Sequence, residues 1–185
     1  MIQSSIQFTA KNGQHFEIRT PLESEAQVSL DMMVEVAATS PYILSTPESF
    51  KGRSVENQIK WFKESAESDS EIILAVYSEG RMIGFCNGRA YKDIKRKHRA
   101  GLGVSLRHEY RGLGIGQELM RVLIESMKKF TGIQIIELEV MMNNKAALQL
   151  YENLGFKKAG IFPKAFILPS GEVSDSLAMY LEVST

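Results

Sequence analysis

Residues 104–116, which read V-S-L-R-H-E-Y-R-G-L-G-I-G, combine the residue types that bind an oxyanion. A short apolar strand leads into a glycine-rich turn, and the turn opens a strongly helical segment. Gly112, Gly114 and Gly116 leave backbone N–H groups uncovered, and the helix adds its unpaired first-turn N–H groups and the positive end of its dipole. Arg111 adds a full positive charge beside them. The stretch therefore predicts a site for a pyrophosphate, and the next question is which cofactor carries it.

Two common phosphate loops do not match this stretch. The nucleotide-triphosphate loop G-x-x-x-x-G-K-[ST] is excluded, because Gln117 and Glu118 follow the last glycine. The dinucleotide fingerprint needs a third glycine where this chain has Gln117 or Leu119. It also needs a carboxylate at the end of the next strand, where the chain has Asn143 and Asn144. These departures disfavour an NAD(P)-linked oxidoreductase, an alternative that binding of NAD would revive.

A third pattern, R-x-x-G-x-G, is matched by Arg111, Gly114 and Gly116, and a second motif follows it in residues 140–156. The matching positions of that second motif are Asn144, Ala147, Tyr151, Gly155 and Phe156. In their order and separation the two motifs resemble the GNAT acetyltransferase superfamily, which binds acetyl-CoA. The resemblance runs from about residue 98 to the C-terminus, whereas the N-terminal half fits the family layout without a comparable signature.

The resemblance implies a single α/β domain over residues 1–185, with a mixed, mostly antiparallel central sheet of about seven strands flanked by about four helices. The residue patterns fit that layout, and Asn12-Gly13 predicts a hairpin turn. Alternating or continuous apolar runs predict strands at 6–9, 15–19, 72–77, 82–91, 98–106, 135–141, 157–168 and 173–181. Helical spacing predicts helices at 23–37, after Ser54, at 114–130 and at 145–154.

The family fold assigns a purpose to the strand at 98–106, whose glycines would otherwise weaken it. In GNAT folds this strand splays from its neighbour, and the pantetheine arm of CoA pairs with its exposed backbone. Asn144 is expected to cap the helix that follows it, and the family also uses this position to contact the cofactor. The resemblance thus implies cofactor binding by Val104, Ser105, Leu106, Arg111, Gly112, Leu113, Gly114, Ile115, Gly116 and Asn144.

Acetyl transfer to an amine defines the chemistry that these residues would perform. Negative charge develops on the thioester oxygen, and by resemblance a backbone N–H near Leu106 stabilises it. The thiolate leaving group needs a proton donor, and Tyr151 stands where the family has its catalytic tyrosine, although a half-buried structural aromatic is the alternative. The general base stays unassigned among Glu137, Glu139, His98 and a water chain.

Composition limits the classes of partner. The chain carries 22 basic and 22 acidic residues, 44% hydrophobic residues and a single cysteine, Cys86. This balance gives no reason to expect nucleic acid or an anionic membrane as partner. The basic run at 92–99 is expected to be a solvated hairpin connection, with a role near the CoA 3′-phosphate or an acidic substrate as the alternative.

Other features bear on cellular location and metal binding. Cys86 is expected to be a buried, inert thiol, and one cysteine cannot form an intrachain disulfide, which favours a reducing compartment. No stretch reaches 18 apolar residues and no signal peptide is recognisable, so a cytoplasmic location is expected. His15, His98 and His108 show no ligand spacing with the cysteine, so no metal is implied.

These observations predict acetyl-CoA-dependent N-acetylation of a primary amine, in a small amine or amino acid. Acetylation of ribosomal-protein N-termini is the nearest alternative, and a non-catalytic acyl-CoA-binding or sensor module is another. Association into a homodimer through the sheet edge or the final hairpin is common in the family, and we expect it here.

Overall fold

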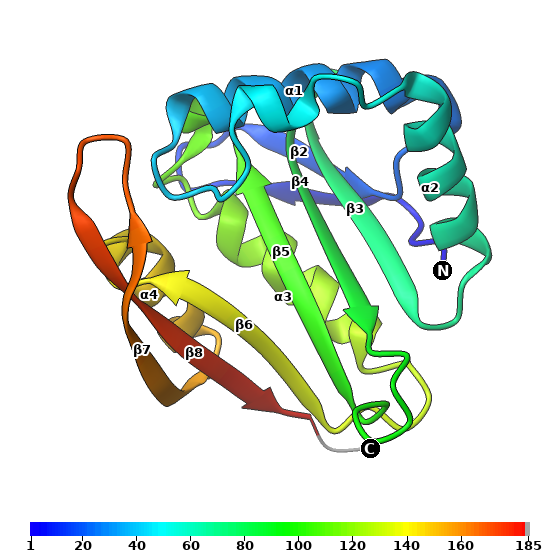
Figure 1. The fold of residues 1–185 in the computed structure, drawn as a ribbon. Helices are drawn as coiled ribbons and strands as arrows, with labels where there is room; N and C mark the ends of the chain where they lie inside the picture. The colour runs from blue at the N-terminus through cyan, green and yellow to red at the C-terminus, as the bar shows by residue number, and fades with distance from the viewer. Residues whose placement is uncertain (184–185) are drawn as a thin grey trace.

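The computed structural model describes residues 1–183 as four helices around one open sheet of eight strands (Figure 1). The strands are β1 (Ile6–Thr9), β2 (His15–Arg19), β3 (Glu71–Ser78), β4 (Arg81–Ala90), β5 (Arg99–Leu106), β6 (Ile135–Met141), β7 (Lys157–Ile167) and β8 (Val173–Glu182). The helices are α1 (Ala26–Thr39), α2 (Val55–Glu67), α3 (Ile115–Met127) and α4 (Lys145–Asn153). The predicted fold class is confirmed.

The sheet has the order β1-β2-β3-β4-β5-β6-β8-β7, and only the β5–β6 pair is parallel. It holds eight strands, which match the eight segments predicted from the residue patterns and exceed by one the seven or so that the family layout implied. The short hairpin β1–β2 joins the edge next to β3. The parallel pair lies in the middle of the sheet, and α3 makes the crossover that a parallel connection requires.

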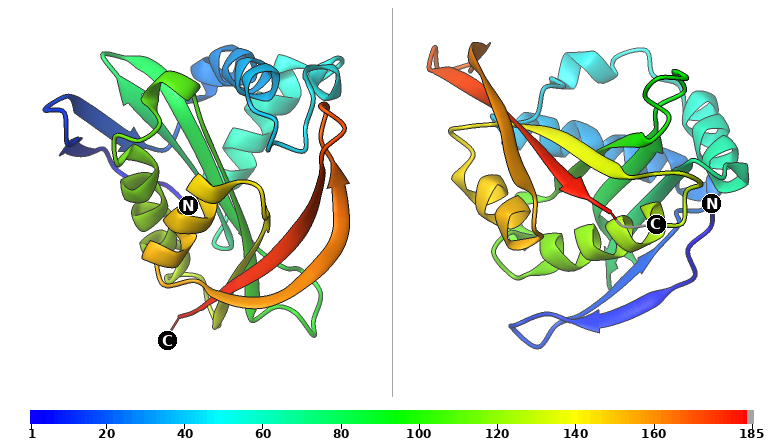
Figure 2. Two further views of the ribbon diagram at one scale, coloured as in Figure 1. Left: turned by 90° about the vertical axis from the view of Figure 1, so that its left-hand side faces the viewer. Right: turned by 90° about the horizontal axis from the view of Figure 1, so that it is seen from below.

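Helices cover both faces of the sheet, as Figure 2 shows: α1 and α2 on one face, and α3 and α4 on the other. Each face has its own apolar core. The first core packs Phe62 of α2 against Ile73 of β3 and Phe85 of β4. The larger core packs Leu119 and Leu123 of α3 against strands of the other face, and Tyr151 of α4 belongs to it.

Local sequence signals explain some of the helix ends. The Ser54 hydroxyl accepts a hydrogen bond from the Asn57 N–H at 3.2 Å and caps α2. Gly155 follows α4 with φ of 87°, the left-handed geometry expected of a residue that ends a helix. The helix predicted from Glu23 starts later, because Glu23–Glu25 forms a 3₁₀ turn before α1.

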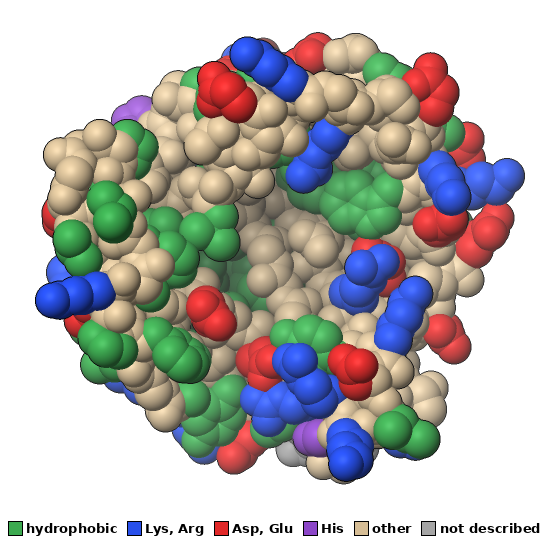
Figure 3. Space-filling view, viewed as in Figure 1, with side chains coloured by type: hydrophobic (Ala, Val, Ile, Leu, Met, Phe, Trp, Pro, Cys, Tyr) green, Lys and Arg blue, Asp and Glu red, His purple; other side chains and the backbone are tan. Residues whose placement is uncertain are grey.

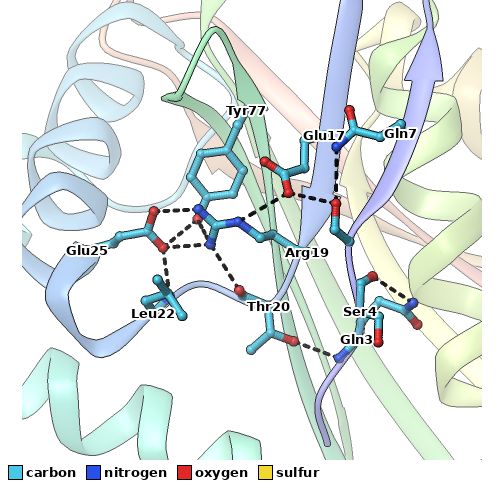
Figure 4. Close-up of polar contacts among 10 residues, drawn as sticks. Gln3, Ser4, Gln7, Glu17, Arg19, Thr20, Leu22, Glu25 and Tyr77 are labelled. Carbon is cyan, nitrogen blue, oxygen red and sulfur yellow. Dashed lines mark hydrogen bonds and ion pairs between the residues drawn. The ribbon is translucent and has the colours of Figure 1, made fainter.

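A polar cluster ties the first strands to the start of α1 (Figure 4). Both terminal nitrogens of Arg19 donate to the carboxylate of Glu25 at 2.8 Å, and the Tyr77 hydroxyl donates to it at 2.8 Å. Burial alone would raise the pKa of Glu25, but hydrogen bonds from Arg19, Leu22 and Tyr77 outweigh it and hold that pKa below its usual value. Burial and the hydrogen bond to Glu25 raise the pKa of Tyr77. The cluster is thus fully satisfied by protein groups.

The final hairpin is as predicted, except for a break in β7. Pairing with β8 is interrupted between Phe162 and Phe166, and Lys164 has φ of 54°. The Lys164 N–H donates to the Asp175 carboxylate at 2.7 Å, which stabilises the break. Pro163, which cannot donate to a ladder, is the sequence signal for it.

Candidate active site

Strands β5 and β6 part soon after they meet. They pair only from Arg99 to Gly101 on β5 and from Ile135 to Glu137 on β6, among the residues described. On its other side β6 pairs with β8 over its whole length, and β5 pairs with β4 from Ala100 to Leu106. The two strands therefore separate after Gly101 of β5 and Glu137 of β6, and we refer to the gap between them as the seam. The seam leaves the later half of β5 with one open edge, as the resemblance implied.

The alternation of the β4–β5 ladder shows which backbone groups face this seam. The Arg107 N–H donates to the Ile83 carbonyl at 2.9 Å, so odd-numbered residues of β5 turn their backbone groups toward β4. Val104 and Leu106 accordingly turn theirs toward the seam. Ser105, expected to bind cofactor, pairs by backbone with Phe85 of β4 instead and presents only its side chain to the α1–α2 face.

The turn between β5 and α3 presents a run of free backbone donors. Within the described part of the chain, no N–H from Gly112 to Gly116 donates a hydrogen bond, and α3 has no side-chain cap. Gly112 and Gly114 have φ of 79° and 85°, a geometry that L side chains rarely adopt, which explains glycine at both positions. We refer to residues 112–116 as the cradle. Unpaired donors at a helix N-terminus are able to bind an anion.

Arg111 has a different contact from the one expected. Its Nε and Nη2 donate to the Leu106 carbonyl at 3.2 and 3.1 Å. The guanidinium thus braces the turn by holding the last carbonyl of β5 and is not aimed at the cradle. The Leu106 carbonyl is on the seam side, so this contact leaves the Leu106 N–H as the free donor at the end of the open edge.

The packing of α4 on α3 brings Leu150, the residue before Tyr151, next to the cradle. A side-chain carbon of Leu150 lies 3.7 Å from where a Cβ on Gly116 would stand. Tyr151 follows Leu150, is 8% exposed, and packs its ring on Phe156 at 5.8 Å between centroids. Burial raises the pKa of Tyr151 to about 12, so its hydroxyl holds its proton at neutral pH. Such a group can donate a proton and cannot act as a base.

Asn144 caps α4, as predicted. Its side-chain oxygen accepts from the Ala147 N–H at 3.2 Å, which leaves the amide nitrogen available. Asn143 donates through its side-chain nitrogen to the Glu172 carboxylate and thereby links the start of α4 to the final hairpin. No local pattern predicts that link, because the two residues lie far apart in the chain.

The face of the sheet that lies away from α3 and α4 is hollowed beside the seam, between the α1–α2 layer and the final hairpin (Figure 3). Gly101 and Gly103 of β5 belong to this face, since they pair with Arg89 and Asn87 on the side of Phe85. A Cβ on Gly103 would meet only the Asn87 side chain, at 3.5 Å. Small residues therefore keep the hollow open beside the seam.

Two carboxylates of β6 point to this face, and they differ in their partners. Glu137 pairs with Arg96 at 3.1 Å and with Arg99. Burial would raise the pKa of Glu137, but hydrogen bonds from Tyr91, Arg99 and Arg96 outweigh it and lower that pKa. Glu139 has no cationic partner among residues 1–183 and accepts a hydrogen bond from the Ser176 hydroxyl at 3.1 Å. Of these two carboxylates, only that of Glu139 therefore has no cationic partner in the described chain, while His98 and a water chain stay open as other candidates for the base.

The remaining candidates take structural positions. Cys86 is fully buried, and burial raises the pKa of its thiol, in agreement with an inert core residue. The residues from Lys92 to Lys97 are exposed, as expected of a solvated connection, but Arg96 stacks on Tyr91 at 3.8 Å as well as pairing with Glu137. The described residues hold no group of three or more potential metal ligands and no helix able to cross a membrane.

Comparison with known proteins agrees with this geometry. The family model described as Acetyltransferase (GNAT) family matches residues 36–156, which include the seam, the cradle and Tyr151. The chain belongs to the GNAT family of acetyltransferases. As a GNAT enzyme it is an acyltransferase, so a non-catalytic module is not supported.

Individual relatives of this GNAT protein span most of its length. An N-alpha-acetyltransferase of Sulfurisphaera tokodaii is 24% identical over 82% of this chain and 86% of its own. The L-amino acid N-acetyltransferase AaaT of Escherichia coli is 26% identical over 64% of this chain and 73% of its own. The structure of yncA from Salmonella typhimurium with its cofactor acetyl-CoA has a TM-score of 0.78 at 16% identity, covering 91% of this chain and 94% of that chain.

Proposed function

We propose that this GNAT protein transfers the acetyl group of acetyl-CoA to the primary amine of a small amine or an amino acid. The observation that carries the proposal is the continuity of the open edge of β5 with the cradle. The edge offers free backbone groups to an amide-containing arm, and the cradle offers free donors to the pyrophosphate at the far end of that arm. CoA has this arrangement of groups.

In the proposed reaction the amine nitrogen attacks the thioester carbonyl and the carbon–sulfur bond breaks. The Leu106 N–H stabilises the developing oxyanion. It is the free backbone group at the end of the open edge, because Arg111 holds the Leu106 carbonyl. Tyr151 gives its proton to the leaving thiolate and recovers one from solvent afterwards. Glu139 accepts the proton that the amine loses, directly or through water. Glu137 is not part of this scheme, because two arginines already hold its carboxylate.

The hollow on the α1–α2 face supports a small acceptor. It lies across the seam from the cradle, so an amine and the acetyl-CoA thioester could approach the same point from opposite faces. The single free carboxylate of Glu139 suits a cationic amine, and a relative that acetylates L-amino acids supports this class. A protein N-terminus is the alternative, supported by the N-alpha-acetyltransferase relative; acetylation of a ribosomal protein remains within that alternative.

A homodimer is proposed on separate grounds. Ile161, Phe162 and Ile167 of the edge strand β7 are 55%, 58% and 78% exposed. Apolar side chains on an unpaired edge strand favour association. Sedimentation equilibrium of the protein and of an Ile161→Lys, Ile167→Lys variant tests this part of the proposal, which a monomeric wild type would contradict.

The activity is tested by a thermal-shift titration with acetyl-CoA, CoA and NAD, followed by CoA release against a panel of amines. A ligand that binds only the native state, at about 100 times its dissociation constant, adds about 2.7 kcal/mol of stability. We expect stabilisation by acetyl-CoA and CoA and none by NAD, with turnover of small amines or amino acids. Turnover of N-terminal peptides alone would favour the protein-directed alternative, and the absence of any shift with acetyl-CoA would contradict the proposal.

A further inference from the structure

The tip of the β1–β2 hairpin lies over the cradle, a contact that no pattern in the sequence predicts. Phe16 of β2 is 1% exposed and packs edge-on against Tyr110, at 6.3 Å between centroids and an interplanar angle of 89°. Phe8 of β1 stacks on Phe16 at 5.4 Å. Tyr110 is in the turn that leads into the cradle, so this aromatic contact fixes the hairpin against that turn.

Lys11 occupies the hairpin tip on the side of the cradle. Its Cε is 4.0 Å from where a Cβ on Gly114 would stand, and the ammonium nitrogen is one bond further on. The tip itself is ordered by backbone hydrogen bonds from Ala10 to Gln14 and from Gly13 to Ala10, both 2.9 Å long. Over residues 1–183 the Lys11 ammonium makes no ion pair or hydrogen bond.

Arg111 and Glu118, which flank the cradle in the sequence, are already engaged. Arg111 donates to the Leu106 carbonyl, and Glu118 in the first turn of α3 is paired with Arg121 at 2.6 Å. The cradle therefore offers backbone donors and a helix dipole, with no side-chain cation of its own directed at it. A pyrophosphate carries two negative charges, and backbone donors alone leave them without a counter-charge.

We propose that Lys11 completes the cofactor site from outside the family motif, by binding the pyrophosphate of acetyl-CoA with its ammonium group. The inference rests on the proposed function, because the pyrophosphate is that of the cosubstrate. A lysine suits this position, since its ammonium is a compact charge with three donors on a flexible stem. The hairpin delivers the charge over Gly114, where a side chain from the cradle itself would not fit the backbone geometry.

The test is equilibrium binding to wild type, Lys11→Met and Lys129→Met. Three ligands are compared: acetyl-CoA, 3′-dephospho-acetyl-CoA and S-acetylpantetheine, which lacks phosphate. Lys129 is an exposed lysine without a described side-chain partner, near the opposite end of α3, so its variant matches the change in net charge. Because Lys11 is exposed and its side chain bonds to nothing, its loss is not expected to affect folding, which a melting curve checks.

We expect Lys11→Met to lower the affinity for acetyl-CoA and for 3′-dephospho-acetyl-CoA by the same factor of roughly 10, equal to about 1.4 kcal/mol. The affinity for S-acetylpantetheine should not change. Lys129→Met should bind all three as wild type does. Unchanged affinity of Lys11→Met for acetyl-CoA would overturn the inference while leaving the proposed function standing. Loss of the effect with 3′-dephospho-acetyl-CoA would also overturn it, because the contact would then be with the 3′-phosphate. A wild type that binds none of the three would contradict the proposed function and this inference together.

Discussion

The polar cluster of Arg19, Glu25 and Tyr77 and the polar backbone around the cradle are organised in opposite ways. In the cluster each charged group has a protein partner within 2.8 Å. The backbone N–H groups of the cradle and those of Val104 and Leu106 on the open edge of β5 have none among residues 1–183. Polar groups without partners lower stability unless water or a ligand binds them. The contrast supports the proposal that the cradle and the seam bind a ligand, whereas the cluster stabilises the fold.

The same contrast recurs on a single strand. Glu137 and Glu139 both point from β6 to the hollowed face, yet Arg96 and Arg99 hold the first and no cation of the described chain holds the second. Residue type and strand periodicity cannot separate two such carboxylates. The difference arises from a connection that precedes β6 by about forty residues and folds back onto only one of them.

The largest effect is expected from removing the hydroxyl of Tyr151, the proposed proton donor. Tyr151→Phe should lower kcat by about 100-fold or more, since an unprotonated leaving thiolate departs slowly, while the dissociation constant for acetyl-CoA stays unchanged. Tyr180→Phe on β8 is the matched control and should keep full activity. Equal losses in the two variants would contradict a specific role for Tyr151.

The pH dependence of wild type sharpens this assignment. Burial raises the pKa of Tyr151 from 10 to about 12, so the acid form persists as pH rises through the ordinary tyrosine range. We expect the absorbance of tyrosinate from this residue, obtained as the difference between wild type and Tyr151→Phe, to appear only above about pH 11. Ionisation near pH 10 would show that the hydroxyl is solvated and not enclosed as described.

A charge placed in the cradle should act on cofactor binding almost as strongly. Gly114→Asp adds a negative charge among the phosphate donors and an L side chain at φ of 85°, so acetyl-CoA affinity should fall by about 100-fold, or about 2.7 kcal/mol. Gly132→Asp has the same chemistry at φ of 74°, in an open turn after α3. Calorimetric titration of both variants with acetyl-CoA separates the effect of a charge in the cradle from the general effect of a glycine-to-aspartate change. Similar acetyl-CoA affinities of the two variants would contradict binding of the pyrophosphate by the cradle.

The two carboxylates of β6 predict a smaller, asymmetric effect. Glu139→Gln should lower kcat/KM for the amine by about 10-fold, because the free carboxylate is lost from the hollow. Glu137→Gln, which leaves two arginines partly paired, should change kcat/KM for the amine by no more than about 3-fold. Steady-state kinetics with varied amine concentration measures both. A larger loss of kcat/KM in Glu137→Gln than in Glu139→Gln would indicate that Glu137, and not Glu139, interacts with the amine.

The smallest effect concerns stability and leaves the ligand untouched. Glu25→Gln should lower the free energy of unfolding at pH 7 by about 1 to 2 kcal/mol without changing acetyl-CoA affinity. The folded pKa of Glu25 is lowered, so its contribution is present above the unfolded pKa near 4.3 and is lost as pH falls through the folded value. Urea titrations at pH 7 and pH 3 should show a difference that shrinks in acid, and a constant difference would contradict the ionic account.

The elements and the cradle could be predicted from the sequence because their signals are local. Gly112 and Gly114 meet a backbone requirement that few other residues can meet, and apolar periodicity placed all eight strands within a few residues. The open edge was expected from the resemblance alone, since glycines at Gly101 and Gly103 indicate a weak strand but not the seam at which it opens.

The contacts of long side chains could not be predicted in the same way. The Arg111 guanidinium reaches back to the Leu106 carbonyl, and Lys11 reaches Gly114 from a hairpin more than a hundred residues earlier in the chain. Both positions depend on tertiary packing, the second on the contact of Phe16 with Tyr110. Spacing within one segment carries no information about such contacts.

Residue-resolved amide exchange, with and without saturating acetyl-CoA, tests the central claim most directly. The backbone N–H groups of Val104, Leu106 and residues 112–116 make no hydrogen bond within residues 1–183 and should become protected at least about 10-fold when the ligand binds. Amides of β6 that already pair with β8 should change little. Binding of acetyl-CoA without new protection at Val104, Leu106 and the cradle would contradict the assignment of this seam as the cofactor site.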